Sequence, residues 1–435
     1  MFSSFKNYAR RALKSLLLIA SLILIGATSG DAIRFSPAQE VAAPYSYDII
    51  SWHFENFLSK WTHRVARFMP WNSLTDIERQ AMVSEYFDLT PRLRELQDQI
   101  KIISAEPKSD VDSTFAILEL ELEAVRIRRL ELRPDVEEAL ESAISAVAKD
   151  QRLGAIGPLI FPPVDIRLTE PPKVLITSPR DRIERTQDVL IDPHVQVEDR
   201  ELMESILLES ENISALVLDI GGVATFPASL YSGGNIKGTL SIAAHEWLHH
   251  YLFFKPLGQN MFKSSEMQVL NETLADLAGK EIGAFALGNF TSATAALGSN
   301  IPVNNMPESL DEETSKIEEF SFSRAMRETR AQVDELLSLG EIEQAEAYME
   351  ERRQVFVANG FNIRKLNQAY FAFNGTYADS AASASPIADQ LKRYRKATPD
   401  VGTFVREVAG YSTYQKFLEG LSAIENLTTE TAVTR

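Results

Sequence analysis

The 435-residue chain contains no cysteine. Disulfides, thiolate nucleophiles and cysteine-ligated zinc sites are therefore excluded, and any transition-metal site must use histidine and carboxylate side chains. Basic residues are also few beside acidic ones, 44 against 61, which gives a formal net charge of −17. Because non-specific binding to nucleic acid needs a basic surface, this balance argues against nucleic acid as a partner.

Long apolar runs are missing with one exception, "SLLLIASLILIGA" at 15–27. Four basic residues and no acid precede it, and the small residues "TSG" follow it, as in a secretory signal. The run is shorter than the roughly 20 residues of a membrane span, but helices adapt to mismatch, so an uncleaved anchor also fits. We predict that residues 1–30 are a signal peptide or a single membrane anchor. The rest of the chain is then extracytoplasmic, by the positive-inside rule.

The amino-acid composition changes twice along the next part of the chain. Residues 31–46 are small, polar and proline-containing, which predicts a linker. Residues 47–152 are predicted to be a helical region, in which Pro134 breaks a helix or begins a new one. Its first helix, with apolar residues at helical spacing from Ile50 to Phe68, is expected to pack on its own domain, the alternative being a membrane surface. The charged faces of the later helices are expected to be solvated, with a partner-binding hairpin as the alternative.

Residues 153–435 form the third predicted region, which we expect to be the catalytic domain. Short β-branched runs between prolines and glycines predict four strands: Val174–Thr177, Val189–Ile191, Ala215–Ile220 and Val223–Phe226. From Gly238 onward the pattern is mostly helical. The whole chain is thus predicted to be α+β: a helical N-terminal region, then a small mixed sheet packed on an active-site helix, then a mostly helical C-terminal part.

Histidine is scarce as well, yet three of the six histidines lie in "SIAAHEWLHHYLFF", 241–254. This stretch lacks proline and glycine until Pro256, so it predicts a helix. Positions four apart lie side by side on a helix, so His245 and His249 can hold one Zn²⁺. Glu246, beside the first histidine, is placed to take a proton from the attacking water. His250 points about 100° away from His249 and is not expected to be a ligand. His53, His63 and His194 are expected to be structural.

A second motif, "NETLADLAGKE", begins 22 residues after His249 on another predicted helix. Glu272 can complete a His₂Glu zinc site and leave a fourth position open for water. Asn271 and Asp276 are predicted to hold the outer nitrogens of the two histidine rings and so to set their tautomers. The glycine-rich "GGNIKGT" lacks the P-loop pattern, and the chain has no G-x-S-x-G, which weakens a serine-hydrolase interpretation.

"HEWLH" and "NETLAD" resemble the thermolysin-like gluzincin metallopeptidases, which carry H-E-x-x-H on one helix and N-E-x-x-x-D on the next. The resemblance covers residues about 215–285. The segments "SPRDRIE", "AHEWLHHYL" and "NETLAD" also resemble a family of uncharacterised bacterial envelope proteins. The gluzincin resemblance implies peptide hydrolysis with zinc and Glu246 as general base. It also implies a strand within "LVLDIGGVATF" at the cleft edge, with which substrate pairs as an added strand.

The chain departs from those enzymes in one respect. They use a downstream histidine and a tyrosine to stabilise the oxyanion, whereas this chain has no histidine after His250. Tyr370 or Tyr377, which flank an Asn-Gly turn, is therefore predicted to supply the hydrogen bond, or the oxyanion is left to zinc. A tyrosine packed in the core is the alternative for each.

The sequence thus predicts an exported or membrane-anchored zinc metallopeptidase that acts on a peptide or protein substrate. Two alternatives remain open: a zinc hydrolase of a non-peptide envelope amide, and an envelope scaffold that keeps zinc but performs no chemistry. A free strand edge beside Glu246 would separate the peptidase from the amide hydrolase. The native metal also stays open, because His₂Glu sites accept several divalent ions.

Overall fold

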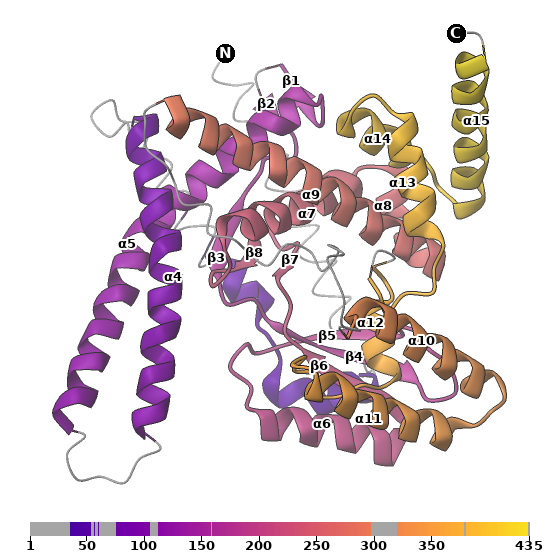
Figure 1. Cartoon of the computed structure of the whole chain (residues 1–435), viewed down its shortest axis with the longest axis horizontal. Coiled ribbons are helices and arrows are strands. Elements are labelled where there is room, and N and C mark those ends of the chain that lie inside the picture. The colour runs from indigo at the N-terminus through magenta and orange to yellow at the C-terminus, as the bar shows by residue number, and fades with distance from the viewer. Residues whose placement is uncertain are drawn as a thin grey trace, which may run out of the picture.

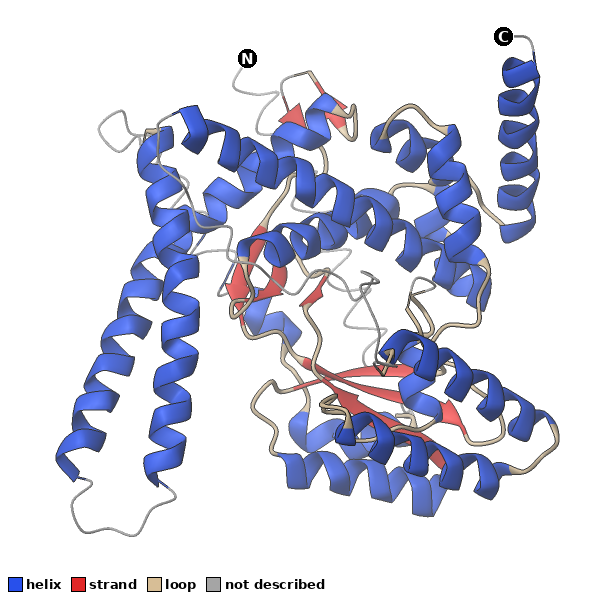
Figure 2. Cartoon of the chain, viewed as in Figure 1, coloured by secondary structure: helices blue, strands red, loops and turns tan. Residues whose placement is uncertain are grey.

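The structure is a computed structural model that describes residues 35–53, 56, 60, 75–104, 112–157, 159–296, 320–377 and 380–433. The predicted signal or anchor at 1–30 lies outside the described residues, as do His63 and most of the predicted helix around it. Within the described ranges, no helix has both the length and the apolar character needed to cross a membrane. The described chain is an α+β fold of long helices and small sheets (Figures 1 and 2).

The largest hydrophobic core lies in what we call the helical lobe. It joins helices and short strands from distant parts of the sequence: α4 (Asp76–Ser104), α5 (Asp112–Asp150), β3 (Ile166–Thr169), β8 (Ala228–Tyr231), α7 (Ile236–Phe253), α8 (Pro256–Gln259), η3 (Met261–Lys263), α9 (Ser265–Ala296), α13 (Ile387–Ala397), α14 (Val401–Val408) and α15 (Tyr414–Val433). The short hairpin of β1 (Ala155–Ile156) and β2 (Leu159–Ile160) lies beside them. Among the described residues, α4 and α5 share this core with α7 and α9.

The smaller cores build the sheet lobe, drawn at the lower right of Figure 1. Its antiparallel sheet has the order β5-β4-β6. Alternation along β4 places Leu175 on the face that packs against α6, and Val174 and Ile176 on the face toward α12. The elements of this lobe are α2 (Pro37–Ala42), η1 (Ala43–Tyr45), β4 (Lys173–Pro179), β5 (Gln187–Ile191), α6 (Val197–Glu211), β6 (Ile213–Leu218), α10 (Phe322–Ser338), α11 (Ile342–Ala358) and α12 (Gln368–Asn374).

A second three-stranded sheet lies against α7 in the helical lobe. β3 runs parallel to β8, and β7 (Gly222–Val223) pairs antiparallel with the other side of β8. Among the described residues, β7 is therefore one of the two edge strands of this sheet, and β3 is the other. The prediction of a strand at Val223–Phe226 was wrong in its extent, because Thr225 donates its N–H to the Val223 carbonyl and its hydroxyl to the Pro227 carbonyl. These local hydrogen bonds form a turn around Thr225, so the strand does not continue to Phe226. β3 and β8 were not predicted.

The segment predicted as a linker is partly structured. Ser36 caps α2 through a hydrogen bond from the Gln39 N–H, and Ala38 and Ala42 are buried against the sheet lobe. Small side chains explain both the prediction and the error. They suit a linker, but they also let a short helix lie close to its neighbours.

α4 and α5 lie side by side as a long hairpin at the left of Figure 1. Pro134 lies inside α5, so the predicted break there is wrong. Two physical reasons account for this. Leu132 and Val136 are buried on either side of the proline and hold the helix in the core. Leu130, whose carbonyl loses its helical donor, lies on the exposed face, where water can replace the missing N–H.

Lys60 is the described residue that connects the N-terminal helical segment to this core. Its buried ammonium lies 2.8 Å from Asp165 Oδ1 and also contacts Glu141 on α5. At this position the segment packs on its own domain, which agrees with the favoured interpretation of the sequence.

Candidate metal centre

The helix that carries both histidines, α7, begins two residues earlier than the sequence suggested. Asn235 caps it by accepting the Gly238 N–H at 2.8 Å. Trp247 is buried on the opposite side from the cleft, and its indole N–H donates to the Pro162 carbonyl at 2.9 Å. This anchor sets the rotation of α7 about its axis, so that His245 and His249 face α9.

Two glycines let α9 approach α7 closely. A Cβ on Gly279 would lie 2.9 Å from the backbone nitrogen of His245, and one on Gly283 would lie 2.7 Å from that of Ser241. Real Cβ atoms do not come so close to backbone, so the helices could not keep this spacing with larger residues. The close approach brings Glu272, two turns earlier on α9, to the two histidine rings.

We therefore expect Gly279→Ala to destabilise the fold by about 1–3 kcal/mol, the usual cost of overpacking. Zinc affinity should fall with it, because the added methyl group pushes α9 away from His245. Urea unfolding and a competitive zinc titration measure the two effects. Gly288→Ala on the same helix is the matched control: its added Cβ meets nothing within 4 Å, so a gain of about 0.5–1 kcal/mol is expected. Equal effects of the two substitutions would contradict the close-approach argument.

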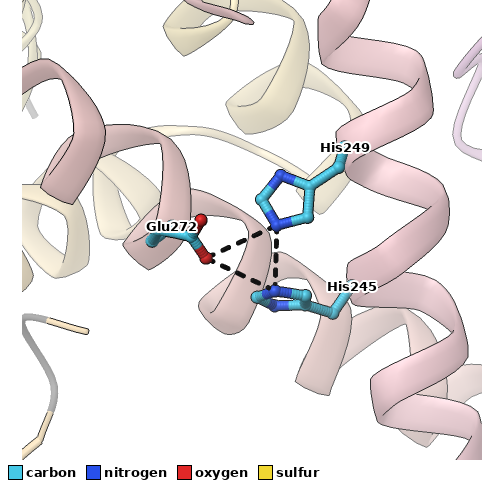
Figure 3. Close-up of side chains that lie close together, drawn as sticks. All are labelled: His245, His249 and Glu272. Atoms are coloured by element: carbon cyan, nitrogen blue, oxygen red, sulfur yellow. Dashed lines mark hydrogen bonds and ion pairs between the residues drawn. The ribbon is translucent and has the colours of Figure 1, made fainter. Parts of the chain in front are cut away.

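Three ligand atoms converge between these helices (Figure 3). His245 Nε2 and His249 Nε2 are 3.0 Å apart, and Glu272 Oε2 lies 3.6 Å and 3.4 Å from them. Ligand atoms about 2.0–2.1 Å from a tetrahedral zinc ion are roughly 3.3 Å from one another. The triangle is therefore of the size that zinc requires, and the His₂Glu donor set suits it.

The charges around the triangle favour a cation at its centre. Burial disfavours the charged His249 ring, but the Glu272 carboxylate outweighs it and raises the pKa of His249 to about 9. Burial also opposes ionisation of Glu272, yet the two histidines hold its pKa well below the ordinary value. The carboxylate thus stays ionised and can bind either a proton-bearing ring or a metal ion.

Asn271 orients one of the rings as predicted. Its Oδ1 lies 3.0 Å from His249 Nδ1, and a carboxamide oxygen only accepts, so Nδ1 carries the proton. In the neutral ring, as a metal ion would require, His249 Nε2 then presents its lone pair toward the centre of the triangle. Asp276 does not orient the other ring in the same way. Its carboxylate accepts a hydrogen bond of 2.7 Å from Lys280, one turn further along α9.

Glu246 lies beside the triangle with its side chain largely buried. Burial raises the pKa of its carboxyl group, although the two histidines act in the opposite direction. Among the described residues it has no hydrogen-bond or ion-pair partner. Gly222 of β7 lies directly against it, since a Cβ there would be 2.6 Å from Glu246 Oε1. The edge strand thus lies next to this carboxylate.

The site opens into a cleft of about 1360 Å³ between the two lobes. One wall comes from α7, α9 and β7, and the facing wall comes from the sheet lobe. Tyr377 lies on that facing wall with its ring centroid 6.2 Å from that of His245. Burial, followed by the nearby Glu272 and Glu246 carboxylates, raises its pKa, so its hydroxyl stays a hydrogen-bond donor.

Tyr370, the other predicted candidate for this role, is not among the residues that line the cleft. It lies on α12, packed among the side chains between that helix and the sheet. Tyr377 follows the end of α12, where the chain leaves the helix and reaches the cleft. The six intervening residues include the helix terminus, so helical periodicity could not decide which ring faces the site.

Arg185 is a cleft residue that the sequence analysis missed. Asp188 holds its guanidinium through bonds of 2.8 Å to Nε and 2.6 Å to Nη2, and the group lies over the Phe373 ring at 5.1 Å. It lines the same wall as Tyr377. The residue directly follows "SPRDRIE", and nothing in the local sequence marks it as a cleft residue. Only the fold shows that it lines the cleft.

The other described histidines lie outside the triangle, as expected. His53 Nε2 accepts the Phe226 N–H at 3.2 Å, and His194 is exposed beside Glu170. His250 lines the cleft near Phe226 but does not contribute to the ligand cluster.

No family model, curated protein or solved structure matches this chain.

Proposed function

We propose that this chain is a zinc-dependent metallopeptidase with a zincin-like catalytic region, acting outside the cytoplasm. The observation that carries the proposal is the triangle of His245, His249 and Glu272 at a cleft, with the Glu246 carboxylate, which has no partner among the described residues, beside it. Bound zinc would polarise the scissile carbonyl and make water a better nucleophile. Glu246 would take the proton of the attacking water and deliver it to the leaving nitrogen. Its raised pKa suits both steps.

The edge strand favours peptide over a non-peptide amide. In the described part of the chain, β7 pairs with β8 on one side only. An extended peptide can add to such an edge through main-chain hydrogen bonds. Gly222 permits the strand to lie against Glu246, so a peptide added there would pass close to the proposed base and the metal triangle. The alternative of an inert zinc scaffold gives no role to the Glu246 carboxylate, which lines the cleft beside the triangle.

The proposal is tested by incubating the zinc-loaded chain, and its Glu246→Gln variant, with a mixture of peptides of random sequence. Mass spectrometry then identifies new peptide ends. Ends that only the parent chain produces, and that a chelator abolishes, would support the peptidase. A parent chain that binds zinc and cleaves none of the peptides would count against it.

The two polar groups on the facing wall are assigned to the oxyanion. Tyr377 would donate to the developing negative charge, and Arg185, held in place by Asp188, would add positive charge on the same side. We expect Tyr377→Phe to lower kcat about 100-fold with little change in KM or zinc content, since one such donor is worth about 10²–10³ in rate. Steady-state kinetics on any cleaved peptide measures this. Tyr370→Phe is the matched control and should leave kcat unchanged; equal losses in both variants would remove Tyr377 from the mechanism.

A further inference from the structure

The hairpin helix α5 has two apolar faces. One face packs against α4 and the core through Leu122 and Leu132, which are buried. The other face points away from α4 and carries four large side chains that remain 49–73% exposed: Ile117, Leu120, Ile127 and Leu130. A solvated helix would carry polar residues there. A contiguous exposed apolar stripe is typical of an interaction surface.

The spacing of this outer stripe is that of a helix-pairing seam. Ile117, Leu120, Ala124 and Ile127 follow one another at intervals of three, four and three residues, the a/d pattern of a coiled coil. The stripe from Ile117 to Leu130 extends about 20 Å along the helix. α5 therefore offers a ready-made helical surface for one more helix.

The charges beside the stripe are acidic in the first half and mainly basic in the second. Glu119, Glu121 and Glu123 lie in the first half, and Arg126 and Arg128 lie in the second half, which ends at Glu131. A parallel second copy would place acid beside acid and base beside base. An antiparallel copy would place the acidic half of each helix beside the basic half of the other, which is the arrangement that such charges favour.

We propose that α5 forms a contact between two copies of this chain, packed antiparallel along the outer stripe. A two-fold axis beside Ala124 sets Leu120 against Ile127 of the partner subunit. The same axis places Glu123 near Arg126 of the partner subunit. The small side chain of Ala124 lets the two helices approach closely at the centre. This contact is independent of the proposed peptidase activity.

Ion pairs within the hairpin prepare this surface. Arg92 of α4 holds Glu121 through a bond of 3.0 Å, and Glu85 of α4 holds Arg128 at 2.6 Å. Such exposed pairs contribute little stability by themselves, but they fix the side chains beside the stripe.

The expected strength of the contact follows from its size and from the folded hairpin. Because the hairpin is already folded, pairing does not carry the ordering cost of an isolated short coiled coil. The seam is smaller than a standard interface, so we expect self-association in roughly the micromolar range. The net charge of −17 disfavours an anionic membrane as the alternative partner.

The absence of native cysteine permits a direct test by disulfide cross-linking of the full chain in mild detergent. Ala124→Cys lies at the axis and should cross-link to itself. Asp98→Cys, exposed on α4, is the matched control. Paired thiols have an effective concentration in the millimolar range, so the cross-link at 124 should form about 100-fold faster than the control. A disulfide requires Cα atoms within about 7 Å, so Leu120→Cys should cross-link only when mixed with Ile127→Cys.

Each result decides the proposal. Rapid cross-linking at 124, mixed cross-linking of 120 with 127, and dimers in sedimentation would support it. Like-with-like cross-links at 120 would indicate parallel packing and overturn it. A chain that sediments as a monomer up to about 100 μM and cross-links no faster than the control would also overturn it. If the thiol of Leu120→Cys were shielded only by added anionic lipid vesicles, the stripe would belong to a membrane surface instead.

Discussion

Replacing Glu246 with glutamine is expected to lower peptide hydrolysis about 10³-fold while zinc binding stays at the parent level. Glutamine keeps the shape of the side chain but cannot take a proton from water, and general-base catalysis typically contributes 10²–10⁴ in rate. Folding should not suffer, because the carboxyl group is buried without a partner and burial already disfavours its charge. Initial rates on a cleaved peptide, together with zinc content, measure the effect.

The matched control for this substitution is Glu266→Gln at the exposed start of α9. It makes the same chemical change on the second site helix, away from the cleft, and should leave the rate unchanged. A Glu246→Gln variant that keeps full activity would rule out Glu246 as the base. If the parent protein has no activity to lose, yet binds zinc, the scaffold interpretation replaces the enzyme.

Replacing Glu272 with alanine is expected to abolish stable zinc binding. It removes one of three ligand atoms, and zinc affinity should fall by more than the 10- to 100-fold that loss of an outer-sphere partner causes. The parent chain, purified without chelator, should carry about one zinc ion by elemental mass spectrometry, and the variant almost none. A chelator should also lower the melting temperature of the parent chain but not of the variant, because only the parent gains stability from bound metal.

Asp276→Ala on the same helix is the control for this measurement. Its carboxylate pairs with Lys280 and not with a histidine ring, so zinc content should not change. A loss of zinc in Asp276→Ala equal to that in Glu272→Ala would mean that Asp276 acts on the ligands after all. Absence of metal from well-folded parent protein, even after zinc is added, would remove the metal centre altogether.

The convergence of the three candidate metal ligands could be predicted because their placement is mostly local. The helical repeat of 3.6 residues makes His245 and His249 neighbours on any helix that contains them, and it also separates His250 from them. Glu272 needed a second helix, and its short polar motif could be matched by pattern. The hydrogen bonds that orient the histidine rings were predicted only in part. Asn271 contacts the His249 ring, whereas Asp276 pairs with Lys280.

Elements that depend on distant packing were predicted less well. α5 continues through Pro134 because buried neighbours such as Leu132 and Val136 hold both sides of it in the core, which no local rule for proline can include. β3 and β8 are four residues each and lie more than 50 residues apart in the chain. Their pairing is decided by α5 and α7, which cover them.

By itself the sequence determined the composition of the candidate metal centre: a cysteine-free chain with scarce histidines, two of them one helical turn apart beside a glutamate. Backbone hydrogen bonding alone sets that spacing. Only the tertiary structure decided that Tyr377 and not Tyr370 reaches the cleft, that Arg185 faces the site, and that the edge strand lies against Glu246. Each of these depends on how the two lobes and the close pair α7–α9 pack. Contacts between residues far apart in the chain create that packing, and no local periodicity encodes it.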